Sequence, residues 1–332
     1  MFKQHHKLLA ITLALGLGGP AAFAQSSVSV YGLLDLSVGS SKNAGASSVN
    51  NIDSGKMSTS YLGFSAAEDL GGGLSALAKV ESFMRADTGE SGRFGGDAFW
   101  ARTAHVGLAH KELGTVTLGR NTTALFVQTL LFNAFGDSFG YSPSIRHYFT
   151  SGTVTGDTGW NQSISYSSPA IGNVRFGLAS AMRSSGALRS NGGNWSANIG
   201  YNAGPLALSA VVQDVKKDGP AAVADTRTTQ LNAAYDFGMM KAFLQVGEVK
   251  NHTTGNKHDI NGIGVRLPLG TGAVIAQYGM LDSATSADRK TTALGYQHNL
   301  SKRTDLYAVY LNDKVDGTGT GNAYSLGVRH RF

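Results

Sequence analysis

The sequence predicts an all-β fold, namely a transmembrane antiparallel β-barrel of about 16 strands with short periplasmic turns and long external loops. Three observations support this prediction. Apolar and polar residues alternate along most of the chain, the alternating segments are long, and short and long connectors follow one another in turn. Helical periodicity is nearly absent, so the period-two signal dominates the whole chain.

The alternation places two kinds of side chain on opposite faces of each segment, as in a β-strand. In Ser27–Gly39, valine and leucine occupy one face, whereas Ser29, Tyr31 and Asp35 occupy the other. About sixteen segments behave in this way, and most have about 10–12 residues: 27–39, 57–67, 73–86, 98–110, 114–125, 160–168, 173–183, 194–203, 204–215, 226–237, 239–250, 258–268, 271–282, 289–300, 303–313 and 322–332. A tilted strand needs roughly 9–11 residues to cross a bilayer, and the usual globular strand has about 5–6.

The connectors alternate between tight turns and longer polar stretches. The tight ones are Glu68–Gly72, Lys111–Leu113, Pro169–Gly172, Pro268–Gly270 and Ser301–Lys302. The long ones are Ser40–Lys56, Asp87–Asp97, Phe126–Gly159, Ser184–Gly193, Lys216–Asp225, Asn251–Lys257, Ser283–Asp288 and Lys314–Gly321. Outer-membrane barrels have this asymmetry between their two ends.

The composition excludes several classes of protein. Charged residues make up only 15% of the 332, and 44 residues are glycine. The absence of cysteine excludes disulfide scaffolds, thiolate metal sites and cysteine nucleophiles. The histidines are scattered, and no G-x-S-x-G elbow or phosphate-binding P-loop occurs, so we expect no enzyme, no cofactor and no metal site. Basic residues are dispersed, which gives no reason to expect a nucleic-acid partner.

The first 24 residues have the features of a secretory signal peptide. Lys3 and Lys7 precede an apolar run, Pro20 ends it, and Ala22-Phe23-Ala24 supplies small residues before a cleavage site. We therefore expect residues 1–24 to be removed on export and residues 25–332 to form one barrel domain. Removal of two lysines leaves 26 basic and 22 acidic residues, a net charge of 26 − 22 = +4.

A soluble secreted β-sandwich that binds a ligand is the alternative fold. Its polar face would meet bulk water and would be rich in lysine and glutamate, whereas this polar face consists mostly of Ser, Thr, Asn, Gln and Gly. We also expect aromatic girdles at the membrane interfaces, formed by Tyr31, Tyr166, Tyr201, Tyr235, Phe237, Tyr278, Tyr296, Tyr310 and Phe332. Both features favour the membrane barrel.

Several motifs resemble the Gram-negative outer-membrane general porins. They are Val30–Asp35 (VYGLLD), Tyr61–Lys79 (YLGFSAAEDLGGGLSALAK), Ala104–Arg120 (AHVGLAHKELGTVTLGR), Asn161–Pro169 (NQSISYSSP) and the terminal strand that ends in Phe332. The resemblance implies a 16-stranded barrel, a homotrimer, and a third external loop that folds inward to narrow the pore. The longest connector, Phe126–Gly159, is in the position of that loop and carries Asp137, but it has fewer acids than the family pattern.

The resemblance also indicates which residues line the pore. Arg102 matches one family arginine, whereas Tyr61 and Ser165 occupy the positions of two others. Three further candidates, Lys79, Glu81 and Arg85, share the polar parity of one strand, and Arg120 follows the next strand but one. Alternation alone does not place Arg102 or Arg120 in the lumen, because both share parity with aliphatic neighbours.

These observations predict a water-filled channel of the cell outer membrane for passive diffusion of small hydrophilic solutes and ions. The positive mature charge and the few acids of the long loop favour a weak anion preference. A substrate-specific channel of the same fold is the alternative. The expected partners are two further copies of the chain, outer-membrane lipid and lipopolysaccharide.

Overall fold

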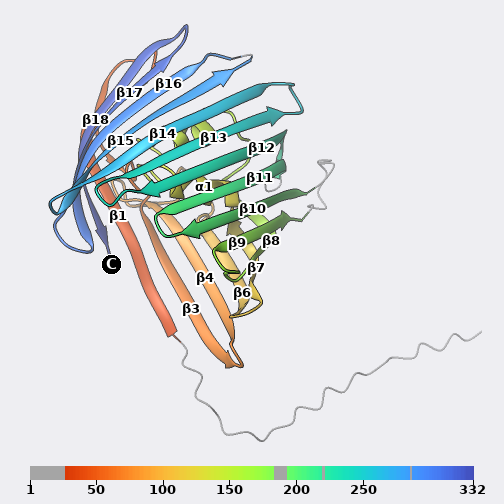
Figure 1. Ribbon diagram of the computed structural model, residues 1–332. Coiled ribbons are helices and arrows are strands. Elements are labelled where there is room, and N and C mark those ends of the chain that lie inside the picture. Colours follow the sequence, from red (N-terminus) through yellow and green to blue (C-terminus); the bar gives the residue numbers. More distant parts are fainter. Residues whose placement is uncertain (1–26, 183–192, 219–220, 285) are drawn as a thin grey trace, which may run out of the picture.

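The computed structural model describes residues 27–182, 193–218, 221–284 and 286–332. The expected signal peptide, residues 1–24, lies outside these ranges. The described chain forms one closed antiparallel barrel of 16 strands, with helices in its interior (Figure 1). This closed barrel confirms the predicted fold class and excludes the two-sheet sandwich.

Sixteen strands build the wall, and two short strands extend it at the end that carries the long loops, which we call the external end. The wall strands are β1 (Ser27–Lys42), β3 (Tyr61–Gly71), β4 (Leu74–Arg85), β6 (Thr103–His110), β7 (Gly114–Thr122), β8 (Gly159–Ser167), β9 (Val174–Ala181), β10 (Asn194–Ala203), β11 (Leu206–Asp218), β12 (Ala221–Asp236), β13 (Lys241–Asn251), β14 (Lys257–Leu269), β15 (Gly272–Ser283), β16 (Arg289–Asn299), β17 (Thr304–Val315) and β18 (Gly319–Arg331). The extensions are β2 (Val49–Ser54), which pairs with β1, and β5 (Glu90–Ser91), which pairs with β4.

The first and last strands close the barrel. β1 pairs with β18 from Leu33↔Arg331 to Lys42↔Asn322. The amide and carbonyl groups of Gly32 and Phe332 exchange two hydrogen bonds of 3.2 Å. A Cβ at Gly32 would lie 2.6 Å from the Phe332 ring, so glycine is needed where the terminal aromatic residue covers the seam. Closure leaves no unpaired strand edge, as a barrel in a bilayer requires.

Several predicted connectors contain more strand than expected, among them Glu68–Gly72, of which residues 68–71 belong to β3, and Asp87–Asp97, which contains β5. The connector Ser40–Lys56 includes β2, because residues 49–54 extend the ladder of β1. Most of the predicted connector Lys216–Asp225 belongs to β11 and β12, which pair as far as Asp218↔Ala221. Similarly, β17 and β18 leave only residues 316–318 of Lys314–Gly321 outside the strands. In these stretches apolar and polar residues do not alternate regularly, so the period-two signal is lost.

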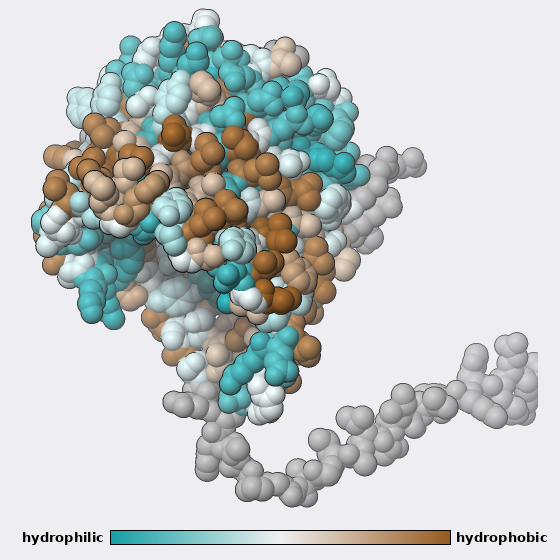
Figure 2. Space-filling view, viewed as in Figure 1, coloured by the Kyte–Doolittle hydropathy of each residue, from teal (hydrophilic) through white to brown (hydrophobic). Residues whose placement is uncertain are grey.

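The two faces of the wall differ in polarity. Outward-facing residues include Val30, Val106 and Leu326, whose side chains are each about 60% exposed. Figure 2 shows hydrophobic residues across the middle of the barrel wall, with hydrophilic residues toward its ends. Most of the aromatic residues expected in the girdles are exposed on this outer surface, but Tyr31 is an exception. The Tyr31 hydroxyl points inward and donates a hydrogen bond to Glu81.

The longest connector, which we call loop 3 (residues 123–158), folds into the barrel and is partly helical. It contains α1 (Ala124–Leu131), α2 (Pro143–Ile145) and the π-helical turn η1 (Arg146–Thr150). The Thr123 hydroxyl caps α1 by accepting a hydrogen bond from the amide of Phe126. Within the described ranges, no helix is long and apolar enough to cross a membrane.

Loop 3 docks against the inner wall where glycines leave space. A Cβ at Gly247 would lie 2.1 Å from the Tyr148 hydroxyl, and a Cβ at Gly279 would lie 2.8 Å from Pro143. Gly262, Gly264 and Gly295 are similarly covered by loop 3. Together these five positions, on β13 to β16, form a groove for the loop, which we call the glycine groove. This groove gives part of the high glycine content a structural reason.

We predict that Gly247→Ala loosens loop 3. The added methyl group overlaps the Tyr148 hydroxyl, and relieving such an overlap costs about 1–3 kcal/mol. Hydrogen exchange followed by mass spectrometry should show faster exchange across residues 124–150. Gly200→Ala on β10 is the matched control, because its nearest neighbouring atom would be 3.8 Å away. Equal exchange in the two variants would show that the glycine groove does not hold the loop.

Candidate functional site

Loop 3 occupies one side of the lumen and leaves the other side open. Its middle part packs with the inner faces of β12 to β17 in a hydrophobic core inside the barrel. The buried members are Met57, Phe132, Ala134, Phe135, Tyr141, Ala234, Phe243, Ile275, Ala293, Tyr307, Val309 and Leu311. The wall formed by β3, β4 and β6 contributes nothing to this core and instead carries charged residues. The open part of the lumen therefore lies between loop 3 and that wall.

Glu81 is the centre of the charged cluster on this wall, which we call the Glu81 cluster. Its carboxylate accepts a hydrogen bond of 2.7 Å from the Tyr31 hydroxyl and pairs with the Lys79 Nζ at 3.0 Å. The Arg102 guanidinium contacts the same carboxylate and lies over the Tyr61 ring, 4.0 Å from its centroid. The structure thus brings together Lys79, Glu81, Arg102 and Tyr61, four of the eight residues that the sequence indicated.

Local geometry explains how Arg102 reaches this cluster. Lys79 and Glu81 follow the alternation of β4 and face inward, opposite His105 and Thr103 of β6. Arg102 precedes the first residue of β6, so the parity of that strand does not determine its direction. Its amide donates a hydrogen bond of 3.3 Å to the Glu81 carbonyl, which places the guanidinium beside the Glu81 carboxylate.

A second group of charges, which we call the Asp305 cluster, lies on β17 and β18 and is joined to loop 3. The Asp305 carboxylate pairs with Arg329 at 3.0 Å and with Arg331 at 3.1 Å. Arg329 also donates a hydrogen bond of 2.8 Å to the Ser58 hydroxyl, which in turn donates one of 2.9 Å to Asp137. Asp137 of loop 3 is therefore held against the wall by a hydroxyl that a buried arginine orients.

Exposure separates three of the four bases from the acids in these two clusters, and Arg329, whose side chain is 9% exposed, is the buried exception. The side chains of Glu81 and Asp305 are only 1% and 2% exposed, whereas those of Lys79, Arg102 and Arg331 are 39%, 30% and 44% exposed. Because these residues face the lumen, a solute meets the cationic groups first. The carboxylates lie beneath them and fix their positions through charge-assisted hydrogen bonds.

The other predicted residues lie apart from the Glu81 cluster. Arg85 pairs with Glu90 at 2.7 Å in the hairpin formed by β4 and β5. Arg120 lies within β7 rather than after it, at an irregularity of the pairing with β8, and its guanidinium contacts Asp157 of loop 3. Ser165 lies on the inner face of β8 and makes no hydrogen bond or ion pair with the Glu81 cluster among the described residues.

An ion-pair network at the external end ties the second loop (residues 86–102) to the end of loop 3. Arg93 binds Asp97 at 2.8 Å and Asp157 at 2.7 Å, and Arg120 contacts the same Asp157 carboxylate. Burial alone raises the pKa of Asp157, but the two guanidinium groups outweigh it and hold this pKa below its usual range. Asp157 is therefore the anchor that both loops share.

Sequence reasoning missed several of these residues. Arg329 and Arg331 stand on the polar face of the terminal alternating segment, so parity was enough to place both in the lumen. Tyr31 also has inward parity, but its aromatic ring favoured the interface interpretation. No sequence signal connects Arg93 with Asp157, because they lie on different loops. Within the described ranges, no group of three or more His, Asp or Glu residues could hold a metal ion.

A closed 16-stranded barrel, with an apolar outer band, a charged inner wall and an inserted third loop, defines a channel protein of the bacterial outer membrane. A family model described as Gram-negative porin matches residues 10–318, and the chain belongs to this family. Members of the family are channels rather than enzymes, and they reside in the outer membrane of Gram-negative bacteria. The resemblance stated from the sequence motifs is therefore confirmed.

Individual relatives agree with this assignment. The chain is 33% identical over 324 residues to outer membrane porin protein 32 of Delftia acidovorans, covering 93% of this chain and 90% of that protein. The structure of an anion-selective porin from Comamonas acidovorans matches with a TM-score of 0.80 and 27% identity, over 93% of this chain and all (100%) of that one. OmpT of Vibrio cholerae in its trimer form matches with a TM-score of 0.68 and 16% identity, over 92% and 99% of the two chains, which shows the shared fold.

We predict that Asp157→Asn detaches the second loop from loop 3. The change leaves Arg120 without its carboxylate and Arg93 with Asp97 alone. Loss of one partner of a buried ion pair costs about 3–5 kcal/mol, which we reduce to about 2 kcal/mol because these side chains are partly exposed. Hydrogen exchange at pH 7 should therefore be about thirtyfold faster in residues 151–158. Asp225→Asn, which alters a long ion pair of 3.9 Å, is the control.

The same contact should make the wild-type loop sensitive to acid. Because the pKa of Asp157 is lowered in the folded protein, its stabilisation is complete above the unfolded pKa of about 3.9 and is lost as the pH falls through the folded value. Acidification through the lowered pKa of Asp157 should therefore reproduce the effect of Asp157→Asn. Protection of residues 151–158 that is unchanged by both the substitution and acid would show that Asp157 is not the anchor.

Proposed function

We propose that the protein is a water-filled diffusion channel for small hydrophilic solutes and ions, with a weak preference for anions. The observation that carries this proposal is the burial of acids beneath bases at the open wall. Solutes pass exposed Lys79, Arg102 and Arg331, while Glu81 and Asp305 are almost wholly covered. The anion-selective porin among the structural relatives supports the same direction of selectivity.

The preference is weak because each exposed base has a carboxylate close to it. Arg102 and Lys79 share Glu81, and Arg329 and Arg331 share Asp305, so each cluster carries a net charge of only +1. Tyr61 and Ser165 stand where the family pattern has arginines, which removes two further positive charges. The remaining preference for anions comes from the exposure of the basic groups and the burial of Glu81 and Asp305.

We predict that Arg102→Ala reduces the anion preference and leaves assembly intact. A unit charge about 4 Å away is worth about 1 kcal/mol in water, so removing it should lower the anion-to-cation permeability ratio by about two- to fivefold in dilute salt. Reversal potentials across a salt gradient in planar bilayers measure this ratio. Glu81 retains Lys79 and Tyr31, so the variant should still fold, as heat-modifiable migration on gels would show.

Arg85→Ala is the matched control for this measurement, because Arg85 pairs with Glu90 in a hairpin outside the Glu81 cluster. It should leave the permeability ratio nearly unchanged. A similar change in both variants would mean that general positive charge, and not the Glu81 cluster, determines selectivity. Clear cation selectivity of the wild-type channel would contradict the proposed preference itself.

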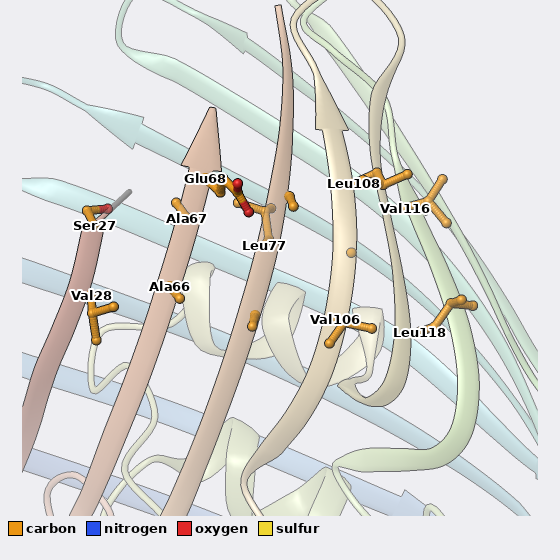
Figure 3. Close-up of a pocket in the computed structure, with 13 residues that line it drawn as sticks. Ser27, Val28, Ala66, Ala67, Glu68, Leu77, Val106, Leu108, Val116 and Leu118 are labelled. Carbon is orange, nitrogen blue, oxygen red and sulfur yellow. The ribbon is translucent and has the colours of Figure 1, made fainter. Parts of the chain in front are cut away.

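We further propose that residues 1–24 are cleaved on export and that three copies of residues 25–332 assemble. The outer surface of β1, β3, β4, β6 and β7 is a shallow apolar groove, which we call the small-residue face (Figure 3). Small side chains such as Ala66, Ala78 and Gly107 form its floor, and Val28, Val106 and Leu118 form its edges. Small residues allow close packing between membrane proteins, so this face suits another copy of the chain.

Lipid contacts occupy the remaining outer surface in this proposal. At the external end of β12 to β14, Lys250 and Lys257 pair with Glu248 at 3.0 and 2.8 Å, and both lysines are about half exposed. By strand parity these side chains face outward, where the phosphorylated headgroups of lipopolysaccharide lie. Exposed ammonium groups attract such phosphates.

We predict that Ala78→Trp weakens trimer formation and preserves the barrel. The indole would fill the small-residue face and hold neighbouring copies apart. Ala210→Trp is the matched control, because Ala210 also faces outward, but on β11, far along the wall from this face. Gels run without heating should show monomeric barrels only for Ala78→Trp. Equal trimer content in the two variants would place the subunit interface elsewhere.

A further inference from the structure

The external mouth contains a polar pocket separate from the Glu81 cluster. It lies between the end of β1, the bend that joins β2 to β3, loop 3, and the inner faces of β17 and β18. Its volume is about 330 Å³. Ser41, Ser54 and Lys56 line one side, and Arg146 and Asp313 line the other.

The residues that line this pocket include more basic than acidic side chains. Lys42, Lys56 and Arg146 line it, and the only acid among the described lining residues is Asp313. Asp313 is already shared, since its carboxylate contacts Arg289 and also pairs with Arg146 at 3.1 Å. Two guanidinium groups therefore compete for one carboxylate, and the pocket has an excess of positive charge.

Arg146 is the most buried of these bases. Its side chain is only 16% exposed, and its Nε has no hydrogen-bond partner in the described part of the chain. Burial lowers the pKa of Arg146 below its ordinary value, although Asp313 acts in the opposite direction. An arginine that shares its only carboxylate with a second guanidinium group favours an added anion, because a bound carboxylate would balance the charge.

The rest of the lining suits a small carbon skeleton. Phe139, Leu311 and Ala323 provide apolar contacts on the side of loop 3, β17 and β18. Hydroxyl groups of Ser41 and Ser54 provide polar contacts on the opposite side. This combination fits an organic acid of a few carbons better than a bare inorganic ion, which would leave the apolar part of the pocket unused.

We propose that this pocket binds small organic carboxylates at the external mouth, before they reach the constriction. The proposal rests on the protein being a channel and adds a solute class to it. Lys56 is the residue to test, because it lines the pocket and its only ion pair in the described ranges, 3.1 Å to Asp53, lies within its own bend. Arg146 is less suitable, because its substitution would also remove one ion-pair partner of Asp313.

Saturation-transfer NMR on purified protein in detergent tests the proposal without requiring conduction. Succinate is the probe, and 1,4-butanediol is a neutral molecule with the same number of carbons. Wild-type protein should bind succinate and not butanediol, and Lys56→Gln should weaken succinate binding about tenfold, as expected for loss of a charge-assisted hydrogen bond. Lys56→Arg should restore it.

Lys241→Gln is the matched control, since Lys241 also faces inward but lies at the opposite end of the barrel, on β13. It should leave succinate binding unchanged. Should Lys56→Gln fail to assemble, Ala323→Phe tests the same pocket by filling it from β18 and should abolish binding. Equal effects of Lys56→Gln and Lys241→Gln, or equal binding of succinate and butanediol, would overturn the proposal.

Planar-bilayer recording separates failure of the pocket from failure of the channel. If the pocket is real, succinate added on the external side should increase current noise more than succinate added on the other side. Conduction with no such asymmetry and no NMR signal would refute the pocket and leave the channel in place. Lys56-dependent NMR binding without conduction would support the pocket and refute the proposed channel function.

Discussion

The packing of loop 3 into the glycine groove is the constraint on which the rest of the interior depends. Tyr148 reaches the wall only because Gly247 has no side chain, and Pro143 has the same relation to Gly279. Interiors of proteins are densely packed, so one added methyl group at these positions must displace the loop or the strand. The position of loop 3 in turn determines which part of the wall remains open to solutes.

This docking divides the barrel into two unlike halves. On the docked side, three wall amides donate hydrogen bonds to loop 3: Gln230 and Gln245 donate to Thr129, and Gln277 donates to Ser144. Such hydrogen bonds offset the free-energy cost of burying the amide groups, so loop 3 can pack against a polar wall. On the open side, Lys79 and Arg102 remain exposed above the buried Glu81. The polar inner face of the barrel therefore binds loop 3 on one side and lines the open lumen on the other.

The strands could be predicted from the sequence because their signal is local. Alternation depends only on neighbouring residues, and it placed Lys79 and Glu81 correctly on the inner face. The glycine groove could not be predicted in this way, since Tyr148 lies 247 − 148 = 99 residues before Gly247, and Pro143 lies 279 − 143 = 136 residues before Gly279. The same limit applies to Arg93 and Asp157, which meet across two loops.

Arg102 and Tyr31 show a different limit. Arg102 precedes its strand, so its parity carried no information, and only the family resemblance pointed to the lumen. Tyr31 has clear inward parity, but tyrosine is common both at membrane interfaces and as a hydrogen-bond donor to a buried acid. Residue type alone could not decide between these roles; the position of Glu81 across the neighbouring strand decides it.

In the proposed channel, the arrangement of acids beneath bases also explains why few charges are sufficient for a preference for anions. At 0.15 M salt, the Debye length is about 8 Å, so distant charges have little effect on an ion in the passage. What an ion meets is the nearest exposed group, and at the open wall this is a lysine or an arginine. The buried carboxylate fixes that base and keeps the net charge low, which avoids strong repulsion between bases across a narrow passage. Selectivity of this kind depends on the direction in which each ion pair points, more than on the total charge of the protein.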